Sequence, residues 1–169
     1  MDLPEQESFD SAFGTLEDRL DELDHYRAFN QKTPLAEPVR GARMTSRFGS
    51  RSDPFLGRKA FHSGLDLATH RGASVESSAS GTVIRAGWAG GYGQMIEIDH
   101  GDGLVTRYGH LSKILVQKGQ SVEQGDPIGA VGSTGRSTGP HLHYEIHENG
   151  KAIDPQRYLR LGRKLMAWL

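Results

Sequence analysis

Turn-forming residues recur at intervals of about eight to twelve residues from Arg43 onward, so every regular element after that point must be short. Short apolar and β-branched segments between such turns are typical of antiparallel sandwiches and barrels. We expect strands over 82–86, 94–99 and 104–108, and the turn "HGDG" joins the last two into a hairpin. The predicted fold is therefore mainly β, an antiparallel β-sheet sandwich.

The first part of the chain follows a different period. Between residues 8 and 30, apolar side chains fall at spacings of four and three, which is the a/d pattern of a heptad seam: Phe9, Phe13, Leu16, Leu20 and Leu23. This predicts an acidic N-terminal helix within residues 1–33. The helix either packs on the domain or is the stump of a longer coiled coil.

Prolines and turn residues set the other boundaries. Pro34 and Pro38 end the helix and predict an extended linker over 34–42. The main domain then occupies 43–160. One or two short helical turns begin near Pro155, which is well placed at a helix start, and 161–169 is expected to be a C-terminal tail.

Charge and cysteine content narrow the classes of site. Residues 1–24 carry nine acidic side chains and one arginine (net −8), whereas the remainder carries 19 basic and 12 acidic side chains (net +7). A basic body favours an anionic partner such as a cell-wall polymer or nucleic acid, and the acidic segment could lie across it and limit access. The chain has no cysteine, which excludes disulfides, thiolate zinc sites and cysteine nucleophiles.

An unusual density of imidazoles occurs in "GPHLHYEIHENG", residues 139–150. Its apolar residues alternate with His141, His143, Glu145 and His147, so on a strand these four polar side chains share one face. In "FHSGLDLA", taken as a strand, His62 and Asp66 also share a face, with Gly64 between them leaving space. Imidazole nitrogen and carboxylate oxygen are normal zinc ligands.

A third fragment, "RYGHLS", places His110 directly after a strand and a glycine. An antiparallel sheet could bring all three fragments onto one face. Three protein ligands with an open fourth position are the plan of a catalytic zinc site. The chain has more histidines in these fragments than three ligand positions require, and the additional ones point to catalysis.

Three longer blocks carry a family resemblance: "SRFGSRSDPFLGRKAFHSGLDLA", "GYGQMIEIDHGDGLVTRYGHLS" and "VQKGQSVEQGDPIGAVGSTGRSTGPHLHYEI". In order and spacing they resemble the lysostaphin-type, LytM-like zinc endopeptidases that cut bacterial peptidoglycan, over about residues 43–158. The resemblance implies an antiparallel β fold with a catalytic groove. It also implies one zinc ion bound by His62, Asp66 and His143, with His110 and His141 as the unliganded catalytic pair.

The expected mechanism is metal-assisted amide hydrolysis of peptide cross-links or bridges, with the two histidines as acid, base or oxyanion donor. Side chains around the site are predicted to bind the peptide substrate: Tyr92, Ser133, Thr134, Ser137 and Thr138. Glu145 is a candidate hydrogen-bond partner of a ligand histidine. The other histidines are expected to be structural or solvent-facing: His25, His70, His100 and His147.

The alternative is a non-catalytic LytM-like regulator that binds cell wall or activates another hydrolase through the N-terminal helix. For either reading we expect a peptidoglycan partner, a protein partner on that helix, no nucleic acid and no contact of this chain with a membrane. The activity implies a periplasmic or cell-envelope location. The start "MDLPEQESFD" lacks the order of a secretory signal, so we expect a signal or anchor upstream in the natural precursor.

Overall fold

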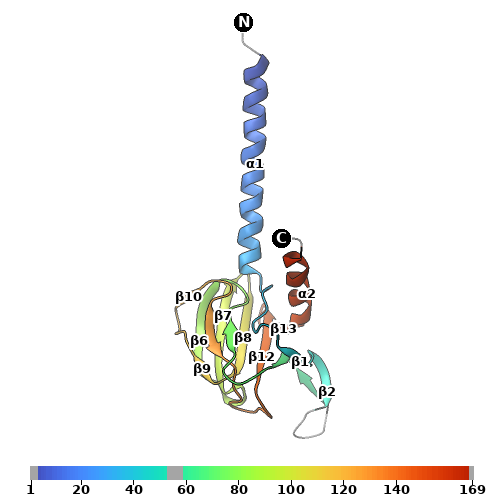
Figure 1. Cartoon of the computed structure of the whole chain (residues 1–169), viewed down its shortest axis with the longest axis vertical. Coiled ribbons are helices and arrows are strands. Elements are labelled where there is room, and N and C mark those ends of the chain that lie inside the picture. Colours follow the sequence, from blue (N-terminus) through green and yellow to red (C-terminus); the bar gives the residue numbers. More distant parts are fainter. Residues whose placement is uncertain (1–3, 53–58, 168–169) are drawn as a thin grey trace.

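The computed structural model describes residues 4–52 and 59–167 (Figure 1). Its helices are α1 (Pro4–Lys32), the short 3₁₀ helix η1 (Gly90–Tyr92) and α2 (Pro155–Met166). Its strands are β1 (Arg43–Ser46), β2 (Gly49–Ser52), β3 (Lys59–His62), β4 (Leu65–Ala68), β5 (Ser74–Glu76), β6 (Gly81–Trp88), β7 (Gln94–Gly101), β8 (Leu104–Leu111), β9 (Lys113–Ile114), β10 (Ser121–Val122), β11 (Pro127–Ala130), β12 (His141–Glu148) and β13 (Lys151–Ile153).

One large sheet dominates the domain. Its strand order is β1-β4-β12-β8-β7-β6-β10, and β13 pairs with β12. A three-stranded sheet, β5-β11-β9, and the β2-β3 pair accompany it. Every strand pair in the described ranges is antiparallel. The predicted mainly β, antiparallel fold is confirmed, as is the hairpin formed by β7 and β8.

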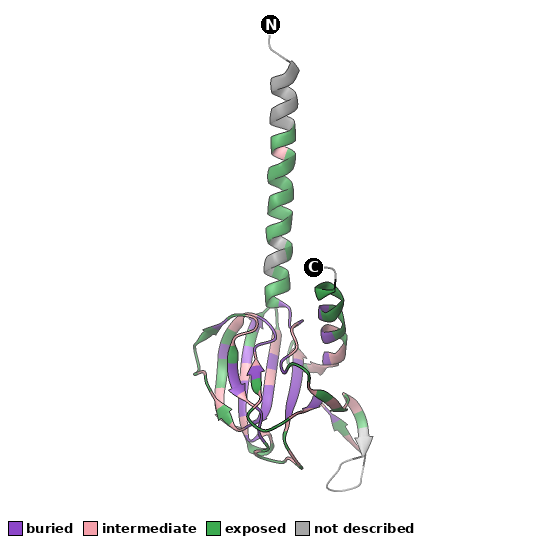
Figure 2. Ribbon diagram, viewed as in Figure 1, coloured by how far each residue is buried: buried purple, intermediate pink, exposed green. Residues whose placement is uncertain are grey.

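The core lies on one face of the large sheet. Leu142, Tyr144 and Ile146 of β12 are fully buried, and they pack in one cluster with residues of the smaller sheet such as Val75 and Ile128. The purple bands of Figure 2 follow this interior. Because successive side chains of a strand point to opposite faces, burial of these three sends the histidines of β12 to the other face, as the alternation predicted.

The segment between α1 and β1 has no helix or strand, as expected for 34–42, yet it packs against the domain. Leu35 and Val39 are buried, Ala36 N donates to Ser78 O at 3.1 Å, and Glu76 N donates to Pro38 O at 2.9 Å. A buried backbone with satisfied hydrogen bonds holds its position. This segment is therefore an integral part of the domain surface.

Helix α2 is longer than the one or two turns expected and continues through residues assigned to the tail. Asp154 caps it by accepting a hydrogen bond from Gln156 N at 3.0 Å, and Pro155 occupies its first turn. A Cβ on Gly162 would lie 2.0 Å from Leu35 O, so α2 and the linker are in close contact there.

Helix α1 projects away from the β domain (Figure 1) and is mostly exposed (Figure 2). Seam residues Leu16, Leu20 and Leu23 are 51–54% exposed, so this apolar seam does not pack on the domain. In the described ranges, no helix has an apolar stretch long enough to span a bilayer.

Candidate metal centre

The centre is built on the middle of the large sheet, where β12 lies between β4 and β8. The register pairs His143 with Asp66 of β4 on one side and with Gly109 of β8 on the other. Directly opposed residues on one face have Cβ atoms about 4.5–5.5 Å apart. Asp66 and His143 are therefore brought together by strand pairing alone, although 77 residues separate them along the chain.

His62 arrives from a different element. We expected the segment "FHSGLDLA" to form one strand, but it is divided between two: β3 ends at His62 and β4 begins at Leu65. Gly64 lies in the turn between them, where an added Cβ would be 2.3 Å from Tyr144 O and 2.9 Å from Glu145 Cγ. The expected purpose of Gly64 was wrong: it leaves room for the backbone of β12 rather than for a ligand above the strand.

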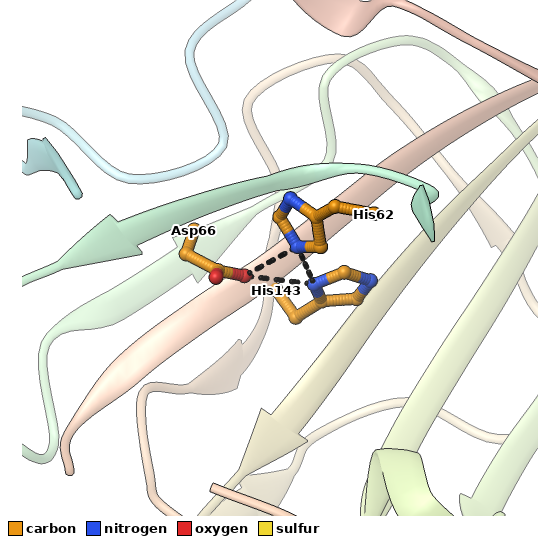
Figure 3. A group of neighbouring side chains, drawn as sticks. All are labelled: His62, Asp66 and His143. Atoms are coloured by element: carbon orange, nitrogen blue, oxygen red, sulfur yellow. Dashed lines mark hydrogen bonds and ion pairs between the residues drawn. The ribbon is translucent and has the colours of Figure 1, made fainter. Parts of the chain in front are cut away.

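Three ligand atoms converge at this point (Figure 3). Asp66 Oδ1 lies 3.1 Å from His62 Nε2 and 2.8 Å from His143 Nδ1, and the two nitrogens are 3.2 Å apart. The other nitrogen of each ring faces an oxygen that can only accept: His62 Nδ1 contacts Arg47 O at 2.7 Å, and His143 Nε2 contacts Glu145 Oε1 at 2.9 Å. Those nitrogens therefore carry the protons of the neutral rings.

With that assignment, two imidazole lone pairs and a carboxylate oxygen face one another in a buried site. Three acceptors at these distances repel unless a cation or an extra proton lies among them. Without a cation, extra protons on the rings must relieve this repulsion, and the pKa values describe that metal-free state. Burial raises the pKa of Asp66, but hydrogen bonds with His143 and His62 outweigh it and hold the pKa far below its usual value. Burial lowers the pKa of His143, but its bonds to Asp66 and Glu145 leave that pKa raised. The donor set therefore fits a divalent metal ion.

His110 and His141 stand beside these ligands. Their ring centroids are 4.7 Å apart, and His141 Nε2 lies 3.7 Å from Asp66 Oδ1. His110 Nδ1 donates to Thr134 O at 2.7 Å and His141 Nδ1 donates to Gly139 O at 2.8 Å. Both contacts leave Nε2 with the lone pair. Burial, opposed in part by the Thr134 carbonyl, lowers the pKa of His110 to about 4, so this ring is neutral at pH 7.

A groove of about 630 Å³ surrounds the five residues, all of which line it. Of the side chains predicted to bind substrate, Tyr92, Ser137 and Thr138 line the groove, whereas Ser133 and Thr134 are not among its lining residues. Thr134 instead fixes the local backbone, accepting from Gln94 N at 3.0 Å. Among the described residues of α1, none lines the groove.

Glu145 contacts a ligand histidine, as the sequence suggested, but sequence reasoning missed what surrounds Glu145. His147, expected to be structural or solvent-facing, donates from Nε2 to Glu145 Oε2 at 2.6 Å. Arg107 donates to the same oxygen at 2.9 Å. The signal for His147 was present, because it lies two residues beyond Glu145 on the same strand face. Arg107 could be found only from the pairing of β8 with β12.

The remaining histidines lie outside the centre. His100 is buried and structural, with Nδ1 2.8 Å from Ser80 O and Nε2 2.7 Å from Thr106 Oγ1. His70 is exposed in a turn. The side chain of His25 lies outside the described residues.

Comparison with known proteins agrees with this geometry. A family model, "Peptidase family M23", matches residues 60–155, which is more than half of the chain. "DD-carboxypeptidase/endopeptidase Mpg" of Neisseria meningitidis serogroup B is 45% identical over 119 residues, covering 70% of this chain and 27% of that protein. "Peptidoglycan DD-endopeptidase ShyA" of Vibrio cholerae is 44% identical over 119 residues, covering 68% of this chain and 27% of that protein. The chain thus spans about a quarter of the length of these relatives.

Solved structures give the same result. A "zinc containing peptidase" from Vibrio cholerae aligns with a TM-score of 0.65 at 39% identity, covering 76% of this chain and 39% of that chain. The catalytic domain of lysostaphin from Staphylococcus simulans aligns with a TM-score of 0.65 at 34% identity, covering 70% of this chain and 92% of that domain. With a family match over most of the β domain and the His-Asp-His cluster at its centre, the chain belongs to peptidase family M23.

Proposed function

We propose that this chain is a zinc-dependent endopeptidase that hydrolyses peptide cross-links or bridges of bacterial peptidoglycan. The observation that carries the proposal is the convergence of three lone-pair ligand atoms beside two further histidines, with all five residues lining one groove. The relatives support the substrate class, because ShyA is named a peptidoglycan DD-endopeptidase.

Zinc would be held by Nε2 of His62, Nδ1 of His143 and a carboxylate oxygen of Asp66. One anionic ligand would leave the centre with a net positive charge, which favours a Lewis acid. When bound, zinc polarises the scissile carbonyl of the substrate and lowers the pKa of a bound water molecule to about 7. Glu145 would keep His143 in the tautomer that offers Nδ1, as carboxylates behind zinc-bound histidines commonly do.

His110 and His141 would move the protons of the reaction. Each donates Nδ1–H to a backbone carbonyl, which fixes the ring and leaves Nε2 as the acceptor. The ring that takes a proton from the attacking water at Nε2 becomes an imidazolium and can then donate that proton to the leaving amine, and a ring protonated at Nε2 can hold the developing oxyanion. His110 is at φ 60°, an uncommon backbone conformation for a residue other than glycine that often occurs at functional sites.

The peptide would lie in the groove against Tyr92, Ser137 and Thr138. We retain Ser133 as a weaker candidate, since its hydroxyl is 2.9 Å from that of Ser137. Thr134 would act indirectly, because its carbonyl accepts from His110 Nδ1 and its hydroxyl accepts from Gln94 N. The catalytic unit would be residues 43–160, to which the packed linker and the end of α2 are attached. It would act in the periplasm or cell envelope.

The exposed seam of α1 would bind a protein partner. Leu16, Leu20 and Leu23 form an apolar stripe whose neighbours in the sequence include Glu17, Asp18, Asp21, Glu22 and Asp24. A helix with a matching apolar stripe and basic flanks would complement it better than a second copy would.

The alternative is a regulator that keeps the fold and activates another hydrolase. The complete set of five site residues favours the enzyme, because a regulator has no need of a metal ligand set together with free histidines.

The deciding experiment measures zinc content and hydrolysis of purified peptidoglycan for the wild type, His141→Ala and His143→Ala. We expect about one zinc per chain in the wild type and His141→Ala, activity in the wild type alone, and loss of zinc in His143→Ala. A loss of zinc in His141→Ala would exchange the roles of the two histidines. Zinc without cleavage in the wild type would favour the regulator.

A further inference from the structure

Behind His143 lies a partly buried cluster of polar side chains that supplies no ligand atom itself. At its centre is Glu145, whose side chain is 0% exposed. Its Oε1 accepts from His143 Nε2 at 2.9 Å, from the Tyr92 hydroxyl at 2.9 Å and from the Ser63 hydroxyl. A carboxylate removed from water in this way is stable only if its charge is balanced.

The balancing charge comes from Arg107. Its Nη1 donates to Glu145 Oε2 at 2.9 Å, next to the bond from His147. Burial lowers the pKa of Arg107, but the nearby carboxylates outweigh it and leave that pKa raised. The guanidinium is thus a fixed positive charge at Glu145 Oε2, and Glu145 Oε1 remains available to His143 together with the two hydroxyls.

Arg107 is itself held rigidly. Its Nε and Nη2 contact Glu97 Oε1 at 2.8 and 2.6 Å. The register pairs Glu97 of β7 with Arg107 of β8, and Arg107 with Glu145 of β12, so the three charges form one row across neighbouring strands. This row lies beside the row that contains Asp66 and His143.

Tyr92 connects the two rows. Its ring lies 5.6 Å from the His143 ring between centroids, and Arg107 Cζ lies 4.8 Å from its centroid. Its hydroxyl accepts from Arg107 Nη1 at 2.9 Å while donating to Glu145. An added Cβ on Gly109 would lie 3.3 Å from Tyr92 Cδ1, so the glycine leaves room for this ring.

We propose that Arg107, fixed by Glu97, is a positioning residue of the metal centre, and that it acts through Glu145 and Tyr92. It orients the carboxylate that fixes the His143 ring, so that Nδ1 is directed at His62 and Asp66. The inference rests on the proposed zinc function. Tyr92 then presents its ring to the groove, while its hydroxyl belongs to the support of His143.

The test is the zinc dissociation constant, measured by competition with a chelator, with urea unfolding of the metal-free proteins alongside. Removing a partner behind a zinc ligand typically weakens zinc binding about 10–100-fold. We expect a loss of about tenfold in Arg107→Met and a smaller loss in Glu97→Gln. Arg107→Lys should recover part of the affinity, because it keeps the charge without the forked geometry. Arg71→Met, an exposed arginine in a turn, is the matched control and should be unchanged.

The outcomes are distinct. A folded Arg107→Met protein that binds zinc as tightly as the wild type would refute the positioning role and leave the proposed function intact. If Arg107→Met does not fold, Glu97→Gln decides, and wild-type zinc affinity in that variant would refute the role. A wild-type protein that binds no zinc would overturn both proposals.

Discussion

Gly64 lies where the turn before β4 packs directly on the backbone of β12, and Gly64→Ala should damage stability and metal binding together. An alanine Cβ at this position would be 2.3 Å from Tyr144 O, whereas ordinary contact begins at 3.4 Å. The obstacle is the backbone of a central strand, which cannot rotate away as a side chain does. The turn and β12 must therefore separate by about 1 Å.

Overpacking of this kind costs about 1–3 kcal/mol and occasionally more, and the central position of β12 places Gly64→Ala at the upper end of that range. A shift of about 1 Å also exceeds the roughly 0.2 Å tolerance of a metal–ligand distance. His143 would move relative to His62, which precedes the turn. We expect zinc affinity to fall at least about tenfold, as for other losses of ligand support.

Urea unfolding of the metal-free protein and chelator competition measure the two effects. Gly139→Ala is the matched control, because its Cβ would meet nothing within 4 Å and its φ is not positive. Wild-type stability and zinc affinity in Gly64→Ala would refute the reasoning, and so would an equal loss in the control.

Three further predictions concern other parts of the molecule. The folded-state pKa of His110 is about 4, below the unfolded value of about 6.5, so its protonation on unfolding lowers stability as pH falls through this window. When the pH falls from 7.5 to 5, the free energy of unfolding of the metal-free wild type, measured with urea, should decrease by roughly 2 kcal/mol more than that of His110→Gln. Equal decreases in the two proteins would contradict the burial of His110. Gly162→Ala places a Cβ 2.0 Å from Leu35 O and should expose α2 to limited proteolysis at a cost of about 1–3 kcal/mol; an unchanged cleavage pattern would show that α2 does not depend on this contact. Leu20→Gln should change the free energy of unfolding by less than about 0.5 kcal/mol, because the site is exposed and glutamine has a helix propensity close to that of leucine. A loss above about 1 kcal/mol in that variant would mean that the seam packs on the domain.

The sequence by itself determined the features that depend on local periodicity. The alternation from His141 to His147 assigned one face of β12 to the core and the other to polar side chains, because a strand has a period of two. Spacings of four and three predicted the N-terminal helix, and turn residues predicted the β7-β8 hairpin. The motifs around His62, His110 and His141 identified the family, which the comparison confirms.

Only the tertiary structure decided which of these residues meet, and at what distance. Strand order places Asp66 and Gly109 on either side of His143, and no local pattern encodes the neighbours of a strand. The same pairing aligns Glu97, Arg107 and Glu145 in one row across three strands, although Arg107 in the sequence is one charged residue among many. Gly64 and Gly162 likewise acquire their roles from backbone that arrives from distant parts of the chain, because a contact between remote segments forms only when the chain has folded.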